Sequence, residues 1–233
     1  MSLREIELST HPSAEERNGL ELGDIVYLTG LMYTGREGVY HRVLDEGAPL
    51  PVSLPEVSAT NFHCAPAASI RDDGTFDLGA VTATASFRFR RYIDSWIAMT
   101  GARLIVGKGG MGSEDYRRAF VPHGVIYLST VGYGTGALLG RGVEKVEAVH
   151  WHEELGLAQA MWILRCRRIG PFIVASDRHG NCLFERENAK IAENLPRIYE
   201  GMRPAVMRRY GETNDPRDEL FGPEVKTRRD AGD

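Results

Sequence analysis

Hydrophobic residues fall into short runs and alternating stretches, separated by glycine, proline and charged turns. Short apolar runs are typical of buried strands, and they occur at residues 25–31, 104–106 and 125–131. Strands are also predicted at 57–70 and 75–81, around a hairpin turn at 71–74, with the proline-broken stretch 48–55 extended. Short helices are predicted after a capping box at Ser13–Glu16, within 34–47 where a loop runs into a helix, through 96–99 and after Ser113 as a cap. This alternation predicts a mixed α/β fold.

The C-terminal third has a different pattern. Residues 170–185 are expected to form a hairpin of strand, turn and strand. Residues 187–210 have a helical pattern interrupted by Pro196 and Pro204, which predicts two or three short helices. Residues 211–233 are charged and poor in apolar residues, so they are expected to form a flexible tail.

Composition narrows the class of protein. The chain has 233 residues, 42% of them hydrophobic and 26% charged, and a net charge of -4. This balance gives no indication of nucleic-acid or membrane binding, and the polar N-terminus does not have the pattern of a secretory signal. The three cysteines, Cys64, Cys166 and Cys182, are far apart and form no CxxC pair. We therefore expect a reducing, cytoplasmic location and no metal site built from this chain alone.

Candidate chemistry first appears at residues 107–112, where Lys108 stands among four glycines directly after an apolar run. Glycines let the backbone turn with φ > 0 or approach a ligand closely, so an anion-binding loop is one interpretation. A solvated turn is the other, and this stretch alone favours neither. The segment is not a P-loop, because the required upstream glycine and the following Ser/Thr are both missing.

A second glycine motif lies at residues 132–137, which have the GxGxxA spacing of a dinucleotide fingerprint between a predicted strand and a helix. The following unit is short for a βαβ crossover, and no acidic residue clearly ends a second strand. Close packing of a helix on a strand is therefore the favoured interpretation, and nucleotide binding through Gly132–Ala137 stays an alternative function.

Three cations share a sequence context that suggests one anionic ligand. Arg36, Arg88 and Lys108 all lie at the ends of predicted strands, beside glycine or small polar residues. In α/β sheets that edge is where ligands bind. Cations that converge on one point repel each other unless an anion joins them, and arginine binds carboxylates with two hydrogen bonds. A solvated basic face is the simpler alternative. If the three cations converge on one point, a small dicarboxylate is the ligand that would fit between them.

Several stretches of the chain together resemble the class I iron–sulfur hydro-lyases, in the C-terminal domain of class I fumarase or the β subunit of L-tartrate dehydratase. The resemblance covers residues 8–185, in the family's order, through the stretches LELGDIVYLTGLMYTGREGVYHRV, PLPVSL, TASFRFRRYID, GKGGMG, VGYGTGALL and GPFIVASDRHGNCLF. It implies a swivelling β/β/α domain at 1–186, followed by a helical extension at 187–210 and the tail. It also implies a [4Fe-4S] cluster held by a partner α subunit, whose open iron acts as a Lewis acid.

The resemblance assigns roles to five positions. Thr84 matches the family's threonine that is thought to be the catalytic base, and Lys108 matches a lysine at the same centre. Arg36 and Arg88 match arginines that would bind the carboxylates of the substrate, together with Lys108. His41 lies one residue further along than the family's histidine, and we include it as a candidate for substrate binding.

Some residues depart from the family pattern. Thr82-Ala83 replaces Gly-Pro before the threonine, Ala85 replaces a second threonine, and Phe89-Arg90 replaces Met-Asp. The expected activity is reversible dehydration of a small 2-hydroxy dicarboxylate, of the malate/fumarate or tartrate/oxaloacetate type, in a heterodimer or heterotetramer that is active only with the α subunit. Because this segment is altered, a second alternative is that the chain is a non-catalytic paralogue of the hydro-lyase subunit.

Overall fold

The computed structural model describes residues 3–132, 134–198 and 200, and the chain divides into two compact units, Met1–Ala189 and Lys190–Asp233. The predicted tail at 211–233 lies outside the described residues, as does most of the segment after 198. The domain boundaries inferred from the sequence stay predictions. The architecture below is that of the first unit.

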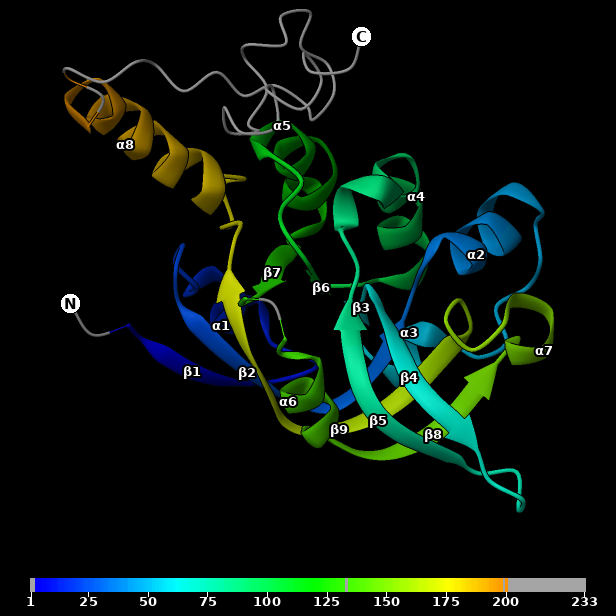
Figure 1. Ribbon diagram of the computed structural model, residues 1–233. Coiled ribbons are helices and arrows are strands. Elements are labelled where there is room, and N and C mark those ends of the chain that lie inside the picture. Colours follow the sequence, from blue (N-terminus) through cyan, green and yellow to red (C-terminus); the bar gives the residue numbers. More distant parts are fainter. Residues whose placement is uncertain (1–2, 133, 199, 201–233) are drawn as a thin grey trace, which may run out of the picture. The chain divides into compact units, whose positions relative to one another are not determined.

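A seven-stranded mixed sheet forms the centre of this unit, with strand order β1-β2-β3-β6-β7-β9-β8 (Figure 1). Strands β1 to β7 of this sheet run parallel, whereas β9 is antiparallel to β7, β8 and β2. Because β9 pairs with both β7 and β2, the sheet closes on itself. The strands are β1 (Glu5–Ser9), β2 (Ile25–Thr34), β3 (Thr60–Phe62), β6 (Leu104–Gly107), β7 (Ile126–Thr130), β8 (Val143–His150) and β9 (Met161–Val174).

A separate two-stranded hairpin, β4 (Cys64–Ile70) and β5 (Phe76–Ala83), leads out of β3. The α-helices are α1 (Ala14–Asn18), α2 (Glu37–Tyr40), α3 (Leu54–Val57), α4 (Arg90–Thr100), α5 (Ser113–Asp115), α6 (Gly136–Arg141), α7 (His152–Leu155) and α8 (Leu183–Ile198). Short π and 3-10 turns extend α2 at His41–Asp45, precede α4 at Ser86–Phe89 and follow α5 at Tyr116–His123.

Alternating side chains on the strands build two hydrophobic cores, because neighbouring residues of a strand face opposite sides of the sheet. One face, with Tyr33, Ile105 and Tyr127, packs against α2, α4 and the turn that follows α5. The other, with Phe62, Val106, Leu128 and Trp162 among others, packs against the β4–β5 hairpin and α6. In Figure 1, helices α2, α4 and α5 accordingly lie on one side of the strands.

The mixed α/β fold with a sheet core and flanking helices confirms the prediction from the sequence. The capping box also forms, since Ser13 and Glu16 bond each other's backbone at the start of α1. The stretch 125–131 was expected to be central and buried, and β7 indeed lies between β6 and β9 with four of its five residues buried.

Four local predictions are wrong. Residues 170–185 do not form a hairpin, because α8 begins at Leu183 and only an isolated bridge joins Ser176 to Cys182. The break expected at Pro196 is absent, because α8 continues through it to Ile198 and the proline costs a single backbone hydrogen bond two residues before the helix ends, whereas the break expected at Pro204 lies outside the described residues. The extended stretch at 48–55 ends in α3 from Leu54 onward. Ser113 does not cap α5 with its side chain; Gly112 holds the N-cap position.

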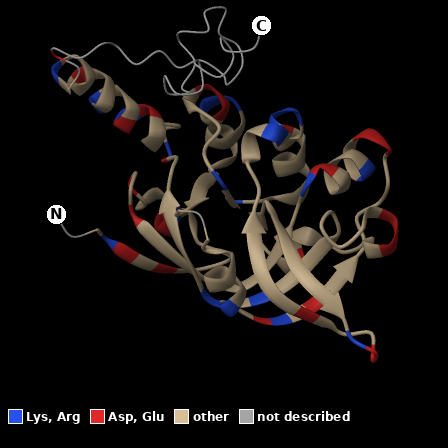
Figure 2. Ribbon diagram, viewed as in Figure 1, with Lys and Arg blue, Asp and Glu red and all other residues tan. Residues whose placement is uncertain are grey.

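Charged residues of both signs are interspersed over the strands and helices, as Figure 2 shows. Ion pairs such as Lys145–Glu147 and Arg71–Asp77 join oppositely charged side chains that lie close together. Among the described residues, no helix is both long and apolar enough to cross a membrane.

Candidate functional site

The candidate site lies where the parallel strands end. The chain leaves β2 at Gly35 and Arg36, and it leaves β6 at Lys108. The segment that follows β5 enters between the extensions of β3 and β6. There the Thr84 N–H donates to the His63 carbonyl at 2.7 Å, and the Lys108 N–H donates to the Thr84 carbonyl at 3.1 Å. The backbones of the two residues predicted to be catalytic are therefore joined directly.

The functional groups of Thr84 and Lys108 are unengaged. Thr84 is 7% exposed, and its hydroxyl makes no hydrogen bond among the contacts of the described residues. Lys108 is exposed, and within the described part of the chain its ammonium group has no ion-pair partner. A buried lysine would need a counter-charge, but an exposed lysine stays charged in water. This edge of the sheet therefore presents a hydroxyl and a cation that are both available to a ligand.

Arg36 and Arg88 lie close enough to influence each other. Burial and the charge of Arg88 both lower the pKa of Arg36. Arg36 donates one hydrogen bond to the Ala158 carbonyl at 2.7 Å, whereas its Nε is buried without a partner. Arg88 is 46% exposed and pairs loosely with Glu37, at 3.7 Å. Two cations with one exposed carboxylate between them favour the binding of a further anion.

His41 is placed differently. Its ring nitrogens lie 3.2 Å from Glu46 and 3.9 Å from Asp45, both on its own turn, and its side chain is 53% exposed. No described contact joins it to Arg36, Thr84, Arg88 or Lys108. The structure brings four of the five candidate residues to neighbouring segments and leaves His41 outside that arrangement. Its role in substrate binding stays a prediction.

Lys108 also lines a hollow of about 280 Å³ with the glycine-rich segment after β7. The other lining residues come from the end of β5 and from positions 130–137, with the threonines Thr82, Thr130 and Thr135 among them. Residues 132–137 do not form a dinucleotide fold: α6 has six residues, and the next strand, β8, pairs with β9 and not with β7. The adjacent βαβ unit that the fingerprint requires is absent from this part of the described chain.

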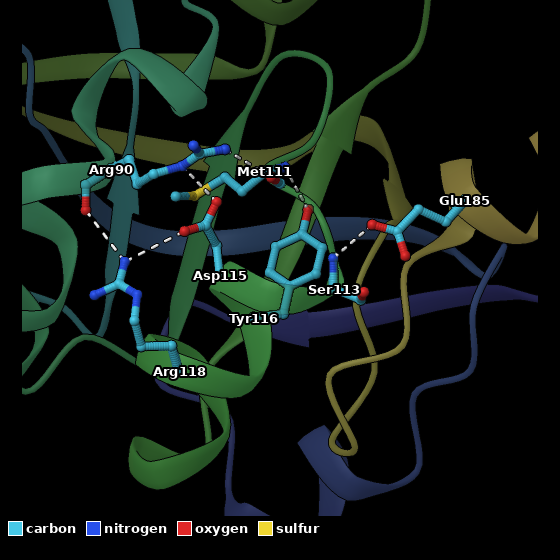
Figure 3. A network of polar contacts seen from close by, with 7 residues as sticks. All are labelled: Arg90, Met111, Ser113, Asp115, Tyr116, Arg118 and Glu185. Carbon is cyan, nitrogen blue, oxygen red and sulfur yellow. Dashed lines mark hydrogen bonds and ion pairs between the residues drawn. The ribbon is translucent and has the colours of Figure 1, made fainter.

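The lysine loop, residues 107–112, is held at its C-terminal end by a network of polar contacts (Figure 3). The Arg90 Nε lies 2.6 Å from a carboxylate oxygen of Asp115, and its Nη2 is 3.4 Å from the Met111 carbonyl. Arg118 lies 3.3 Å from the other Asp115 oxygen. The Met111 N–H donates to the Tyr116 hydroxyl at 3.1 Å. The positive charge gained at Arg90 therefore forms an ion pair with Asp115, which Arg118 shares.

A further contact in Figure 3 ties the start of α5 to α8. The Ser113 N–H donates to the Glu185 carboxylate at 2.8 Å, and this bond lowers the pKa of Glu185. The pattern of the sequence does not single out Asp115 or Glu185. Asp115 is recognised only in the structure, because an acidic side chain that is 7% exposed requires a cationic partner.

The described residues do not fit a metal cluster of their own. No three His, Cys, Asp or Glu side chains among them are grouped as a metal site would require. Burial also raises the pKa of Cys64 well above its usual range and that of Cys166 to about 12. These thiols stay protonated at neutral pH, whereas a metal binds the thiolate.

Comparison with known proteins gives matches along most of the chain. The model of the family described as fumarase C-terminus matches residues 1–187. "L(+)-tartrate dehydratase subunit beta" of Escherichia coli (strain K12) is 34% identical over 196 residues, which are 83% of this chain and 93% of that protein. "Putative L(+)-tartrate dehydratase subunit beta" of Methanocaldococcus jannaschii is 36% identical over 179 residues, 76% of this chain and 89% of that protein. "Putative fumarate hydratase class I" of Geobacillus stearothermophilus is 31% identical over 197 residues, 84% of this chain but 37% of that protein.

Proposed function

This chain belongs to the fumarase C-terminus family, and from that premise we propose that it is the β subunit of a two-subunit hydro-lyase. The proposed reaction is the reversible removal of water from a small 2-hydroxy dicarboxylate. Relatives named for tartrate dehydratase and for fumarate hydratase support this class of reaction. The name "subunit beta" of the tartrate dehydratase relatives supports an α subunit as the partner.

One observation carries the proposal: the Lys108 N–H bonds the Thr84 carbonyl at 3.1 Å, so an available hydroxyl and an unpaired cation lie on adjoining segments. Arg36 and Arg88 supply further positive charge from neighbouring segments. Removal of a proton beside a carboxylate places negative charge on that carboxylate in the transition state. Fixed cations stabilise that charge more strongly than they stabilise the ground state.

In this proposal Arg36 and Arg88 bind and orient the carboxylates, and Lys108 neutralises the charge that develops. Thr84, as the alkoxide that the neighbouring cations favour, accepts the proton from the carbon next to the carboxylate. The electron pair of that C–H bond forms the C=C bond while the C–O bond of the 2-hydroxyl group breaks, so that hydroxide leaves and the proton and hydroxide together make one water. The cluster of the partner subunit would supply a Lewis acid for this leaving group. A free threonine hydroxyl is a weak base, so this role depends on the cations around it. We place the iron–sulfur cluster on the α subunit, because the described residues of this chain do not fit one. We also propose that the protein is located in the cytoplasm.

The test uses the native complex, purified without oxygen through this chain together with the protein that it binds. L-malate, the tartrates and 2-methylmalate are offered in turn, and the unsaturated or keto acid product is followed. Turnover of one substrate, lost in Lys108→Met and in Thr84→Ala, would support the assigned roles and identify the substrate. Turnover that survives both substitutions would favour the non-catalytic alternative for this chain.

A further inference from the structure

Five polar side chains form a continuous buried chain beneath the candidate site. They come from α2, β3, the residue that follows β3, the 3-10 turn before α4, and β7, and each is 0% exposed: Tyr40, Asn61, His63, Ser86 and Tyr127. Polar groups are rarely buried so completely unless they bond one another. The chain runs across the sheet face that carries α2 and α4, directly below the ends of β3 and β6.

The contacts of this chain are short. The Asn61 amide donates to the Tyr40 hydroxyl at 2.7 Å, and the Tyr40 hydroxyl lies 2.7 Å from His63 Nε2. On the other side of the ring, His63 Nδ1 lies 2.7 Å from the Ser86 hydroxyl. Tyr127 donates to the same hydroxyl at 2.7 Å. A neutral imidazole offers one donor and one acceptor, so it can join two hydroxyls in this way.

The buried chain also contacts the backbone of the site. The His63 carbonyl accepts from the Thr84 N–H at 2.7 Å. The Tyr127 hydroxyl lies 3.4 Å from the Lys108 carbonyl. The Ser86 hydroxyl contacts both His63 and Tyr127, so it links these two contacts. The two segments that carry Thr84 and Lys108 therefore share one set of buried partners.

Glycine at two strand ends makes room for this chain. A Cβ at Gly107 would lie 2.0 Å from the Ser86 hydroxyl and 2.6 Å from the Tyr127 hydroxyl. A Cβ at Gly35 would lie 2.7 Å from the Tyr40 hydroxyl and 2.9 Å from Asn61 Oδ1. Real Cβ atoms do not approach other atoms so closely, so each glycine is required by the buried hydroxyls. The absence of a side chain at Gly107 is therefore explained by packing in the interior and not by a bound ligand.

We propose that Ser86 and Tyr127, joined through His63 to Tyr40 and Asn61, are positioning residues that hold the Thr84 and Lys108 segments at a fixed spacing. The expected effect on catalysis rests on the proposed function. The structural part of the inference, that these residues fix the spacing of the two segments, does not depend on it. Catalysis is sensitive to such spacing, because a misplacement of about 1 Å can cost roughly a hundredfold in rate.

The test compares Tyr127→Phe and Ser86→Ala with a matched control, Tyr33→Phe, in the native complex. Tyr33 is also a fully buried tyrosine on this face of the sheet, and its hydroxyl bonds Thr100 at 3.3 Å, away from the site segments. We expect Tyr127→Phe and Ser86→Ala to lower kcat about tenfold or more with a smaller change in KM. Tyr33→Phe should shift the melting temperature by a similar amount and leave kcat within about twofold. Equal kcat losses in all three variants would overturn the proposal.

A second readout keeps the test independent of the reaction. Hydrogen exchange of the Thr84 and Lys108 amides, measured on the same complexes, should accelerate about tenfold in Tyr127→Phe and Ser86→Ala and not in Tyr33→Phe. Unchanged exchange would refute the positioning role. Accelerated exchange in a complex whose wild type converts no 2-hydroxy dicarboxylate would instead refute the proposed function and leave the positioning role standing.

Discussion

Lys108 differs from the arginines around it, because no contact within the described chain uses its charge. Arg36 already donates to Ala158, and Arg88 faces Glu37. Arg90, which departs from the family pattern, is paired with Asp115 and does not add a free cation to the site. The residue that is least engaged in the fold is thus the one most available to a substrate.

We expect Lys108→Met to remove a charge that matters in catalysis and not in folding. The loss of one fixed group that stabilises developing charge lowers kcat by about a hundredfold to a thousandfold. The melting temperature should change little, because the side chain is exposed and forms no described ion pair. Steady-state kinetics of the native complex and a thermal melt measure the two effects. A variant that unfolds more readily would contradict this separation.

His63 gives a prediction for pH. Burial lowers the pKa of His63 to about 3, whereas in the unfolded chain its pKa is near the ordinary histidine value of 6.5. Between these two values the unfolded state binds a proton that the folded state does not. Stability is therefore unaffected by this residue above pH 6.5 and falls as the pH drops below it, by about 1.4 kcal/mol per pH unit.

His63→Asn should remove this slope. The variant is expected to be less stable than the wild type at pH 7.5, because the hydroxyls of Tyr40 and Ser86 lose a partner. The difference in unfolding free energy should narrow as the pH falls from 6.5 towards 3. Urea unfolding of both proteins across this range gives the measurement. Parallel curves would mean that His63 is not held neutral by the fold.

At the scale of elements, the loop between β6 and α5 is fixed from both ends. Its first residues join the Thr84 segment, and its last residues are bound by Arg90 and Tyr116 (Figure 3). Gly109 and Gly112 have φ of 76° and 104°, which side-chain-bearing residues rarely adopt. The loop that carries Lys108 is therefore a shaped turn between two anchors, and not a free solvated loop.

Asp115→Asn should loosen the second anchor. It leaves Arg90 and Arg118 without their shared carboxylate, at an expected cost of about 1 to 2 kcal/mol in unfolding free energy. Because the same Arg90 bonds the Met111 carbonyl, we also expect a fall in kcat/KM of several fold. Glu114→Gln is the matched control, since this exposed neighbour on α5 has no described ion pair. If the two variants behave equally, Asp115 does not anchor this loop.

At the scale of the whole molecule, the described part of this chain offers cations and an unengaged hydroxyl but no group of metal ligands. The "Putative fumarate hydratase class I" relative is much longer, and this chain corresponds to 37% of its length.

The chain alone should therefore neither assemble a cluster nor catalyse dehydration. We expect that incubation of the purified chain with iron, sulfide and a reductant, without oxygen, yields no stable iron–sulfur absorption after desalting. The same treatment of the native complex should restore its absorption and activity. A cluster retained by the chain alone would overturn the assignment of the cluster to the partner.

The sequence alone determined the mixed α/β class, the buried β7 and the capping box of α1, because each rests on local periodicity or on contacts within four residues. The resemblance to known hydro-lyases also pointed to Arg36, Thr84, Arg88 and Lys108 before any fold was known. Whether these residues carry out the chemistry stays a prediction. The second strand expected in 170–185 failed because Asp177 accepts bonds from the His179 and Asn181 amides and turns the chain into α8.

Only the tertiary structure decided how these residues are held. The buried chain from Asn61 to Tyr127 joins segments that are far apart in the sequence, and no local pattern specifies which hydroxyl meets which imidazole. The same holds for Gly107: a side chain there would collide with the hydroxyl of Ser86, which lies 21 positions earlier in the sequence. Periodicity reports which face of an element is buried, whereas the pairing of polar groups inside a core depends on how several elements pack together.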